Sequence, residues 1–101
     1  MKNTTVLLAS TALAMGATSV FAEGSITAVS WGGAYTKSQI EAYHKPWNAE
    51  TGNTVVSEDY SGGLAEIKTQ VETGSVTWDV VDVELSDAIR GCDEGLFEEI
   101  D

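Results

Sequence analysis

Apolar residues along the chain alternate between two kinds of segment. Three short runs rich in valine and isoleucine are typical of buried strands, and they occupy residues 25–30, 54–58 and 79–83. Each run precedes a segment whose apolar residues repeat as on one face of a helix, at residues 34–44, 64–72 and 84–92. This order predicts an α/β fold, a βαβαβα unit whose crossover connections make the three strands parallel.

The first expected helix has a predicted inner face and a predicted break. Ile40, Tyr43 and Trp47 form the apolar stripe that should face the sheet. Because Pro46 lacks a backbone N–H, the helix should break near Lys45 and restart as a short turn.

Glycines mark where the helices should end. Gly52 is expected to be a left-handed cap, and Gly74 and Gly95 should end the second and third helices. The apolar stripe of the third helix consists of Leu85, Ala88, Ile89 and Cys92. The single cysteine, Cys92, is therefore expected to be a buried and unreactive thiol.

Residues suited to ligand binding follow the strand ends. The carboxyl ends of parallel strands share one edge of the sheet, where open α/β folds bind their ligands. Glycine pairs follow the first two strands and would let a ligand approach the backbone, and two acids flank the end of the third. The predicted ligand-binding residues are Trp31, Gly33, Tyr35, Tyr60, Ser61, Asp82 and Glu84.

Aromatic rings and carboxylates at one edge favour a small organic cation as the ligand. A ring face attracts the positive charge, and a carboxylate hydrogen-bonds the ammonium group. Two of these residues could serve the fold instead, since Trp31 could anchor a core and Glu84 could stabilise a helix start through the helix dipole. The formal net charge of −11 excludes simple nucleic-acid backbone binding, and a solvated acidic surface accounts for it as well as attraction of cations does.

No residue pattern indicates catalysis, a metal site or a cofactor. The single histidine, His44, has no metal-ligating partner three or four residues away. The glycine pairs match neither a dinucleotide fingerprint nor a phosphate-binding loop. Asp79 and Asp82 should point to opposite faces of a strand, so they form no acid–base pair. We therefore expect a binding protein rather than an enzyme, with no cofactor.

The N-terminal residues 1–22 predict a cleavable secretory signal peptide. Lys2 precedes the apolar run 6–14, and Val20-Phe21-Ala22 fits a small-residue cleavage site. The product would then be periplasmic. The remaining residues, 23–101, are few and contain one cysteine, so they are expected to be an incomplete N-terminal lobe of a longer protein.

Four motifs carry a resemblance to a known family: SWGGAY (30–35), YSGGLA (60–65), TWDVVDV (77–83) and RGCDEGL (90–96). With them the chain resembles periplasmic solute-binding proteins of ABC transporters, more narrowly the spermidine/putrescine-binding family. The resemblance implies a two-lobed type II periplasmic binding protein fold, of which this chain is the first part of lobe one. In polyamine binders the loop after the first strand supplies an aromatic, matched by Trp31, and an acid, where glycine and alanine stand here.

The function that this resemblance implies is capture of a small cationic solute such as a polyamine. A monomeric, non-enzymatic binding protein would deliver the solute to an ABC permease in the membrane. Three alternatives stay open: a binding protein for another solute (an amino acid, another amine or a metal), a secreted hydrolase or lyase, and a short secreted interaction domain.

Overall fold

The computed structural model describes residues 24–101, so the predicted signal peptide lies outside the described residues. The elements in chain order are β1 (Ser25–Ser30), α1 (Gly33–Gln39), the π-helix η1 (Ile40–His44), α2 (Lys45–Thr51), β2 (Thr54–Asp59), α3 (Ala65–Thr73), β3 (Val80–Val81) and α4 (Leu85–Asp93). Within this part of the chain, no helix has the length and apolar character needed to cross a membrane.

The sheet has the predicted parallel arrangement. Its strand order is β2-β1-β3, and β1 pairs in parallel with both neighbours. Ser30, the last residue of β1, lies beside Asp59 of β2, while Val29 lies beside Val81 of β3. All three strands therefore end at one edge, and the α/β fold class is confirmed.

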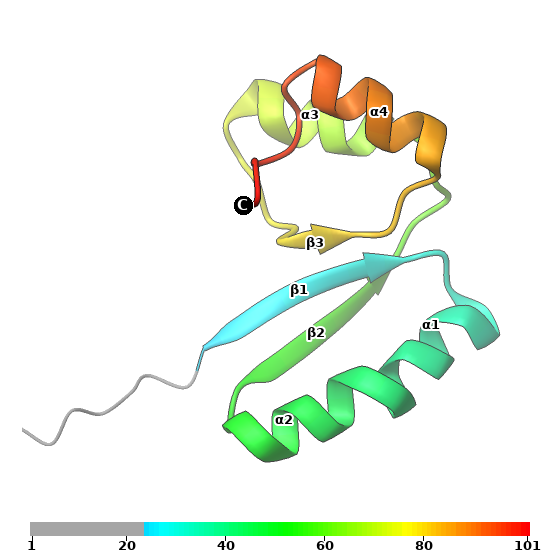
Figure 1. The fold of residues 1–101 in the computed structure, drawn as a ribbon, viewed down its shortest axis with the longest axis vertical. Helices are drawn as coiled ribbons and strands as arrows, with labels where there is room; N and C mark the ends of the chain where they lie inside the picture. The colour runs from blue at the N-terminus through cyan, green and yellow to red at the C-terminus, as the bar shows by residue number, and fades with distance from the viewer. Residues whose placement is uncertain (1–23) are drawn as a thin grey trace, which may run out of the picture.

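Helices lie on both sides of the sheet (Figure 1). α1, η1 and α2 form one continuous run on one side, and α3 and α4 lie together on the other. The buried apolar side chains are few, and they are Val29, Tyr60, Leu64 and Ile67. The core thus lies mainly between the central strand and α3.

The predicted break before Pro46 is wrong. The chain stays helical from Gly33 to Thr51 and passes through the π-helical turn η1, where the Lys45 N–H donates to the Ile40 carbonyl five residues earlier. A wider turn accommodates a proline without interrupting the helix. Tyr43 is 70% exposed, yet it lines a pocket together with Ile26 of β1 and Val55 of β2.

The prediction of a buried Cys92 is also wrong, because the thiol is exposed. α4 turns its small residues inward instead: Gly91 is buried, and a Cβ on it would lie 2.2 Å from Cε2 of Phe97. The predicted glycine ends are confirmed. Gly52, Gly74 and Gly95 have φ of +73°, +68° and +71°, as expected for left-handed caps.

Candidate functional site

Three turns meet at the carboxyl edge of the sheet, and we call residues 31–35, 60–64 and 82–84 the rim. The Tyr60 N–H donates to the Ser30 carbonyl (2.8 Å), and the Asp82 N–H donates to the Val29 carbonyl (2.9 Å). The Tyr60 hydroxyl donates to the carbonyl of Asp82, so the second and third turns touch across the end of β1. The rim gathers all seven residues predicted from the sequence.

The first turn depends on Gly32 more than on the predicted Gly33. Gly32 has φ +85° and ψ −175°, a backbone region that is essentially restricted to glycine. A Cβ there would lie 3.3 Å from the carboxyl group of Asp59, whereas nothing lies within 4 Å of one on Gly33. The Gly32 N–H donates to Thr36 Oγ1 (2.8 Å), which fixes the turn against the start of α1.

Two aromatic side chains of the first turn form a partly exposed pair. The ring centroids of Trp31 and Tyr35 are 5.2 Å apart with an interplanar angle of 37°. Trp31 is 39% exposed, and a Cβ on Gly62 would lie 3.5 Å from its Nε1, so the indole reaches the second turn. This pair offers aromatic surface to a ligand at the rim.

Tyr60 is a buried residue of the rim. It is 7% exposed, and its ring contacts Trp78 edge to face with centroids 5.3 Å apart. Burial raises the pKa of the Tyr60 phenol, a hydrogen bond with Trp31 opposes this, and the negative charges of Asp87, Asp82 and Glu66 raise the pKa further. Tyr60 therefore supports the rim as a neutral hydroxyl.

The other predicted residues differ in how freely they face solvent. Ser61 and Glu84 are exposed, and Asp82 is half-buried. Asp82 Oδ2 accepts hydrogen bonds from Ser30 Oγ (2.7 Å) and Gln39 Nε2 (2.6 Å). Glu84 is therefore the more available carboxylate for a ligand.

Three polar residues at this edge are not among the predicted ligand-binding residues: Thr36, Gln39 and Asp59. Thr36 Oγ1 donates to Asp59 Oδ1 (2.9 Å), and Gln39 donates to Asp82. The sequence places Asp59 at the strand-end edge, and the structure shows it as the last residue of β2, directly across from Ser30. The contacts of Thr36 with Asp59 and of Gln39 with Asp82 gave no local signal, because these partners are distant in sequence.

The rim also collects helix N-termini. α1, α3 and α4 begin there, with N-cap residues Gly32, Leu64 and Glu84, and none of the three caps makes a side-chain hydrogen bond to its helix. The first N–H groups of a helix have no intrahelical partner and carry partial positive charge. The rim thus offers donors suited to an anionic group beside rings and a carboxylate suited to a cationic one.

Residues 24–101 contain no group of three or more histidine, cysteine, aspartate or glutamate residues that could hold a metal ion. A pocket lies between α3, β3 and the residues after α4, and Val83 is the rim residue in its lining. Its walls are mostly apolar and include Ile67, Val71, Trp78, Val81, Leu96 and Phe97.

The fold matches part of the periplasmic binding protein fold, and the proteins that match are solute-binding proteins of ABC transporters. Over 89 residues, 88% of the chain, the sequence is 45% identical to the gamma-aminobutyric acid-binding protein of Pseudomonas aeruginosa. No protein-family model matches the chain.

Two solved structures show the same fold at lower identity. An ABC transporter substrate-binding protein from Bradyrhizobium japonicum USDA 110 is 38% identical with a TM-score of 0.73. The periplasmic binding protein AgtB of A. tumefaciens R10, in complex with agropinic acid, is 33% identical with a TM-score of 0.72. In both comparisons 77% of this chain is covered.

The chain spans only a part of these relatives. It covers 25% of the Pseudomonas protein and 24% of each of the two solved chains. The names of the three relatives mention gamma-aminobutyric acid and agropinic acid, and none mentions a polyamine. The expectation of a polyamine-binding family is therefore not supported, whereas the broader class is.

Proposed function

We propose that this chain is part of the extracytoplasmic solute-binding protein of an ABC transporter, and that the rim is one wall of its solute site. The observation that carries the proposal is the convergence of three strand-end turns around the exposed Trp31–Tyr35 pair. The 45% identity to a gamma-aminobutyric acid-binding protein supports the same function.

The solute class that the rim favours is a small zwitterion rather than a polyamine. Gamma-aminobutyric acid carries both an ammonium and a carboxylate group. The Trp31–Tyr35 pair and the exposed Glu84 suit the ammonium. The uncapped start of α3 suits the carboxylate, a group that a polyamine lacks.

The same proposal implies a second lobe, a periplasmic location and a permease partner. Residues 23–101 would form the first part of lobe one, and a second lobe would close over the solute by a hinge motion. The protein would act in the periplasm, deliver its solute to a membrane permease and catalyse no reaction. The relatives support this, since they are binding proteins rather than enzymes.

A chimera tests the proposal, because the chain spans a quarter of the relative. Residues 24–101 would replace the matched segment of the Pseudomonas gamma-aminobutyric acid-binding protein, and calorimetry would measure binding of gamma-aminobutyric acid and of putrescine. We expect at least tenfold tighter binding of gamma-aminobutyric acid. Trp31→Ala should weaken that binding by about tenfold, the size of one partly desolvated cation–ring contact.

Trp47→Ala is the matched control, because Trp47 lies in α2, outside the rim. It should leave the affinity within about twofold of the parent, as expected for a residue that touches no solute. Tighter binding of putrescine would overturn the proposed solute class. Equal affinities of the parent and Trp31→Ala would overturn the proposed site.

A further inference from the structure

Two carboxylates and a hydroxyl form a row across the end of the sheet. Asp59 ends β2, Ser30 ends β1, and Asp82 directly follows β3. Ser30 lies beside Asp59 in the strand register, and its hydroxyl donates to Asp82 Oδ2 at 2.7 Å. The two carboxylates therefore flank the central strand, one on each side.

α1 is tied to both ends of this row. Thr36 and Gln39 are three residues apart, so they share one face of the helix. Thr36 Oγ1 donates to Asp59 Oδ1 (2.9 Å), and Gln39 Nε2 donates to Asp82 Oδ2 (2.6 Å). α1 is thus held at two points, by the ends of β2 and β3, which lie on either side of β1.

The same contacts reach the glycine turn. Thr36 is 6% exposed, and its oxygen both donates to Asp59 and accepts the Gly32 N–H. The aromatic residues beside this turn cannot hold it by burial, because Trp31 and Tyr35 are 39% and 50% exposed. Hydrogen bonds to charged acceptors are short and directional, and so they can set the angle of a helix start.

We propose that Asp59 and Asp82 are positioning residues, whose carboxylates hold α1 through Thr36 and Gln39 and thereby place the Trp31–Tyr35 pair at the rim. The importance of that placement rests on the proposed function. Asp82 then acts mainly on the protein rather than on the solute, since the oxygen that faces α1 already accepts two hydrogen bonds.

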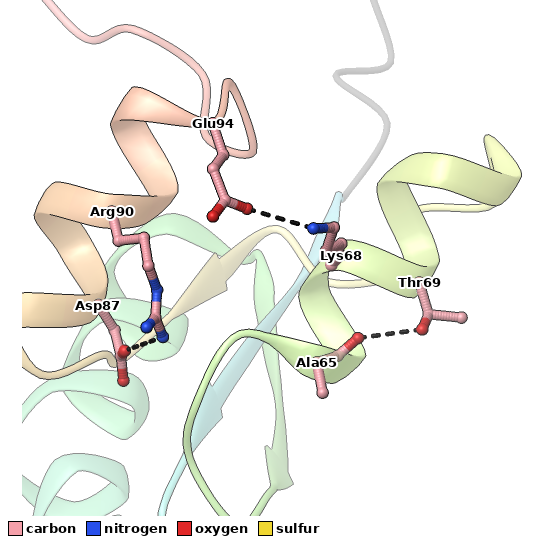
Figure 2. Close-up of polar contacts among 6 residues, drawn as sticks. All are labelled: Ala65, Lys68, Thr69, Asp87, Arg90 and Glu94. Carbon is pink, nitrogen blue, oxygen red and sulfur yellow. Dashed lines mark hydrogen bonds and ion pairs between the residues drawn. The ribbon is translucent and has the colours of Figure 1, made fainter.

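The test follows the three tryptophans of the full chain without any solute. With 5-fluorotryptophan incorporated, ¹⁹F NMR should give one resonance each for Trp31, Trp47 and Trp78, assigned by single Trp→Phe variants. Thr36→Val removes the hydroxyl at nearly constant shape, and Gln39→Met removes the amide. Two variants serve as controls. Thr36→Ser keeps the hydroxyl. Thr69→Val makes the same threonine-to-valine substitution in α3, where the Thr69 hydroxyl donates to the Ala65 carbonyl of its own helix (Figure 2).

We expect Thr36→Val and Gln39→Met to move the Trp31 resonance toward its position in the urea-unfolded chain and to leave the Trp47 and Trp78 resonances in place. Thr36→Ser and Thr69→Val should retain the parent spectrum. An unmoved Trp31 resonance in both disruptive variants would overturn the proposal. Equal movement of all three resonances would overturn it too, because the contacts would then serve overall stability rather than the rim. Solute binding plays no part in this readout, so its outcome is independent of the chimera's.

Discussion

The rim and the outer face of α4, formed by Leu85 and Ile89, differ in how many contacts they make with the rest of residues 24–101. At the rim, every turn is tied to another element: Gly32 to Thr36, Thr36 to Asp59, and Tyr60 to Asp82. On α4, Leu85 is 77% exposed and Ile89 is 58% exposed. The rim is therefore largely assembled by this part of the chain, whereas the apolar side of α4 is uncovered.

α3 shows that the difference does not lie in the sequence pattern. Both helices have nine residues and an apolar stripe, yet in α3 the stripe packs on the sheet, with Ile67 6% exposed. α4 reaches α3 through the Lys68–Glu94 ion pair (3.5 Å), while Asp87–Arg90 lies within α4 (Figure 2). Exposed ion pairs of this kind contribute little stability. A stripe predicts which side chains share a face, but not which element covers it.

Gly32→Ala should weaken the rim most. A non-glycine residue at φ +85° and ψ −175° is strained, and the new Cβ would press on Asp59 at 3.3 Å. We expect a loss of about 2–3 kcal/mol in the free energy of unfolding, measured by urea denaturation. Gly33→Ala is the matched control, since its Cβ meets nothing within 4 Å, and it should cost about 1 kcal/mol. Equal losses in the two variants would contradict a role for Asp59 in the packing of the turn.

Gly91→Ala tests the inner side of α4. In an ordinary helix interior this change stabilises by about 1 kcal/mol. Here the Cβ would lie 2.2 Å from Cε2 of Phe97, so we expect a net loss of about 1–2 kcal/mol. In a Phe97→Ala background the same change should become neutral or stabilising. A penalty that survives without the ring would show that Phe97 is not its cause.

Features that depend on neighbouring residues were predictable from the sequence. The alternation of strands and helices and the glycine caps Gly52, Gly74 and Gly95 follow from periodicity and backbone preference, and the structure confirms them. The convergence of the three turns was predictable as well, because parallel strands end at one edge.

Features that depend on packing and on side-chain partners were not predictable. The exposure of Cys92 goes with the packing of Gly91 onto Phe97, and the helix continues through Pro46 by way of a π-helical turn, and neither feature follows from an apolar repeat or a residue preference. The contacts of Thr36 and Gln39 join residues 23 and 43 positions apart. No local pattern specifies such pairs. A small organic cation was inferred from the rings and carboxylates, whereas the polyamine came from a resemblance, and none of the residues quoted for that resemblance distinguishes a polyamine from another amine.

Tyr60→Phe should have a smaller effect, and one that depends on pH. The variant loses the hydrogen bond to the Asp82 carbonyl, at a cost of about 1 kcal/mol near neutral pH. Because burial raises the pKa of Tyr60 above its ordinary value of 10.0, the folded state holds the phenol proton more tightly than the unfolded state. The stability from the neutral phenol is thus complete below pH 10.0 and is lost as the pH rises through the folded-state pKa.

The measurement is the difference in unfolding free energy between the parent and Tyr60→Phe, followed from neutral to alkaline pH. It should shrink above pH 10.0. Tyr43→Phe is the control, since Tyr43 is 70% exposed and should leave the stability unchanged. A constant difference across this range would contradict a raised pKa.

Ile89→Gln should have the smallest effect on stability, and it tests the uncovered face directly. Ile89 is 58% exposed, so little apolar surface returns to water, and glutamine is the better helix former. We expect the free energy of unfolding, measured by urea denaturation, to change by less than about 0.5 kcal/mol. The same substitution at Ile67, 6% exposed, should prevent stable folding because it buries an amide in the core. If Ile89→Gln destabilised the chain as strongly as Ile67→Gln, the outer face of α4 would have to be packed in solution, and the contrast between the two helices would fail.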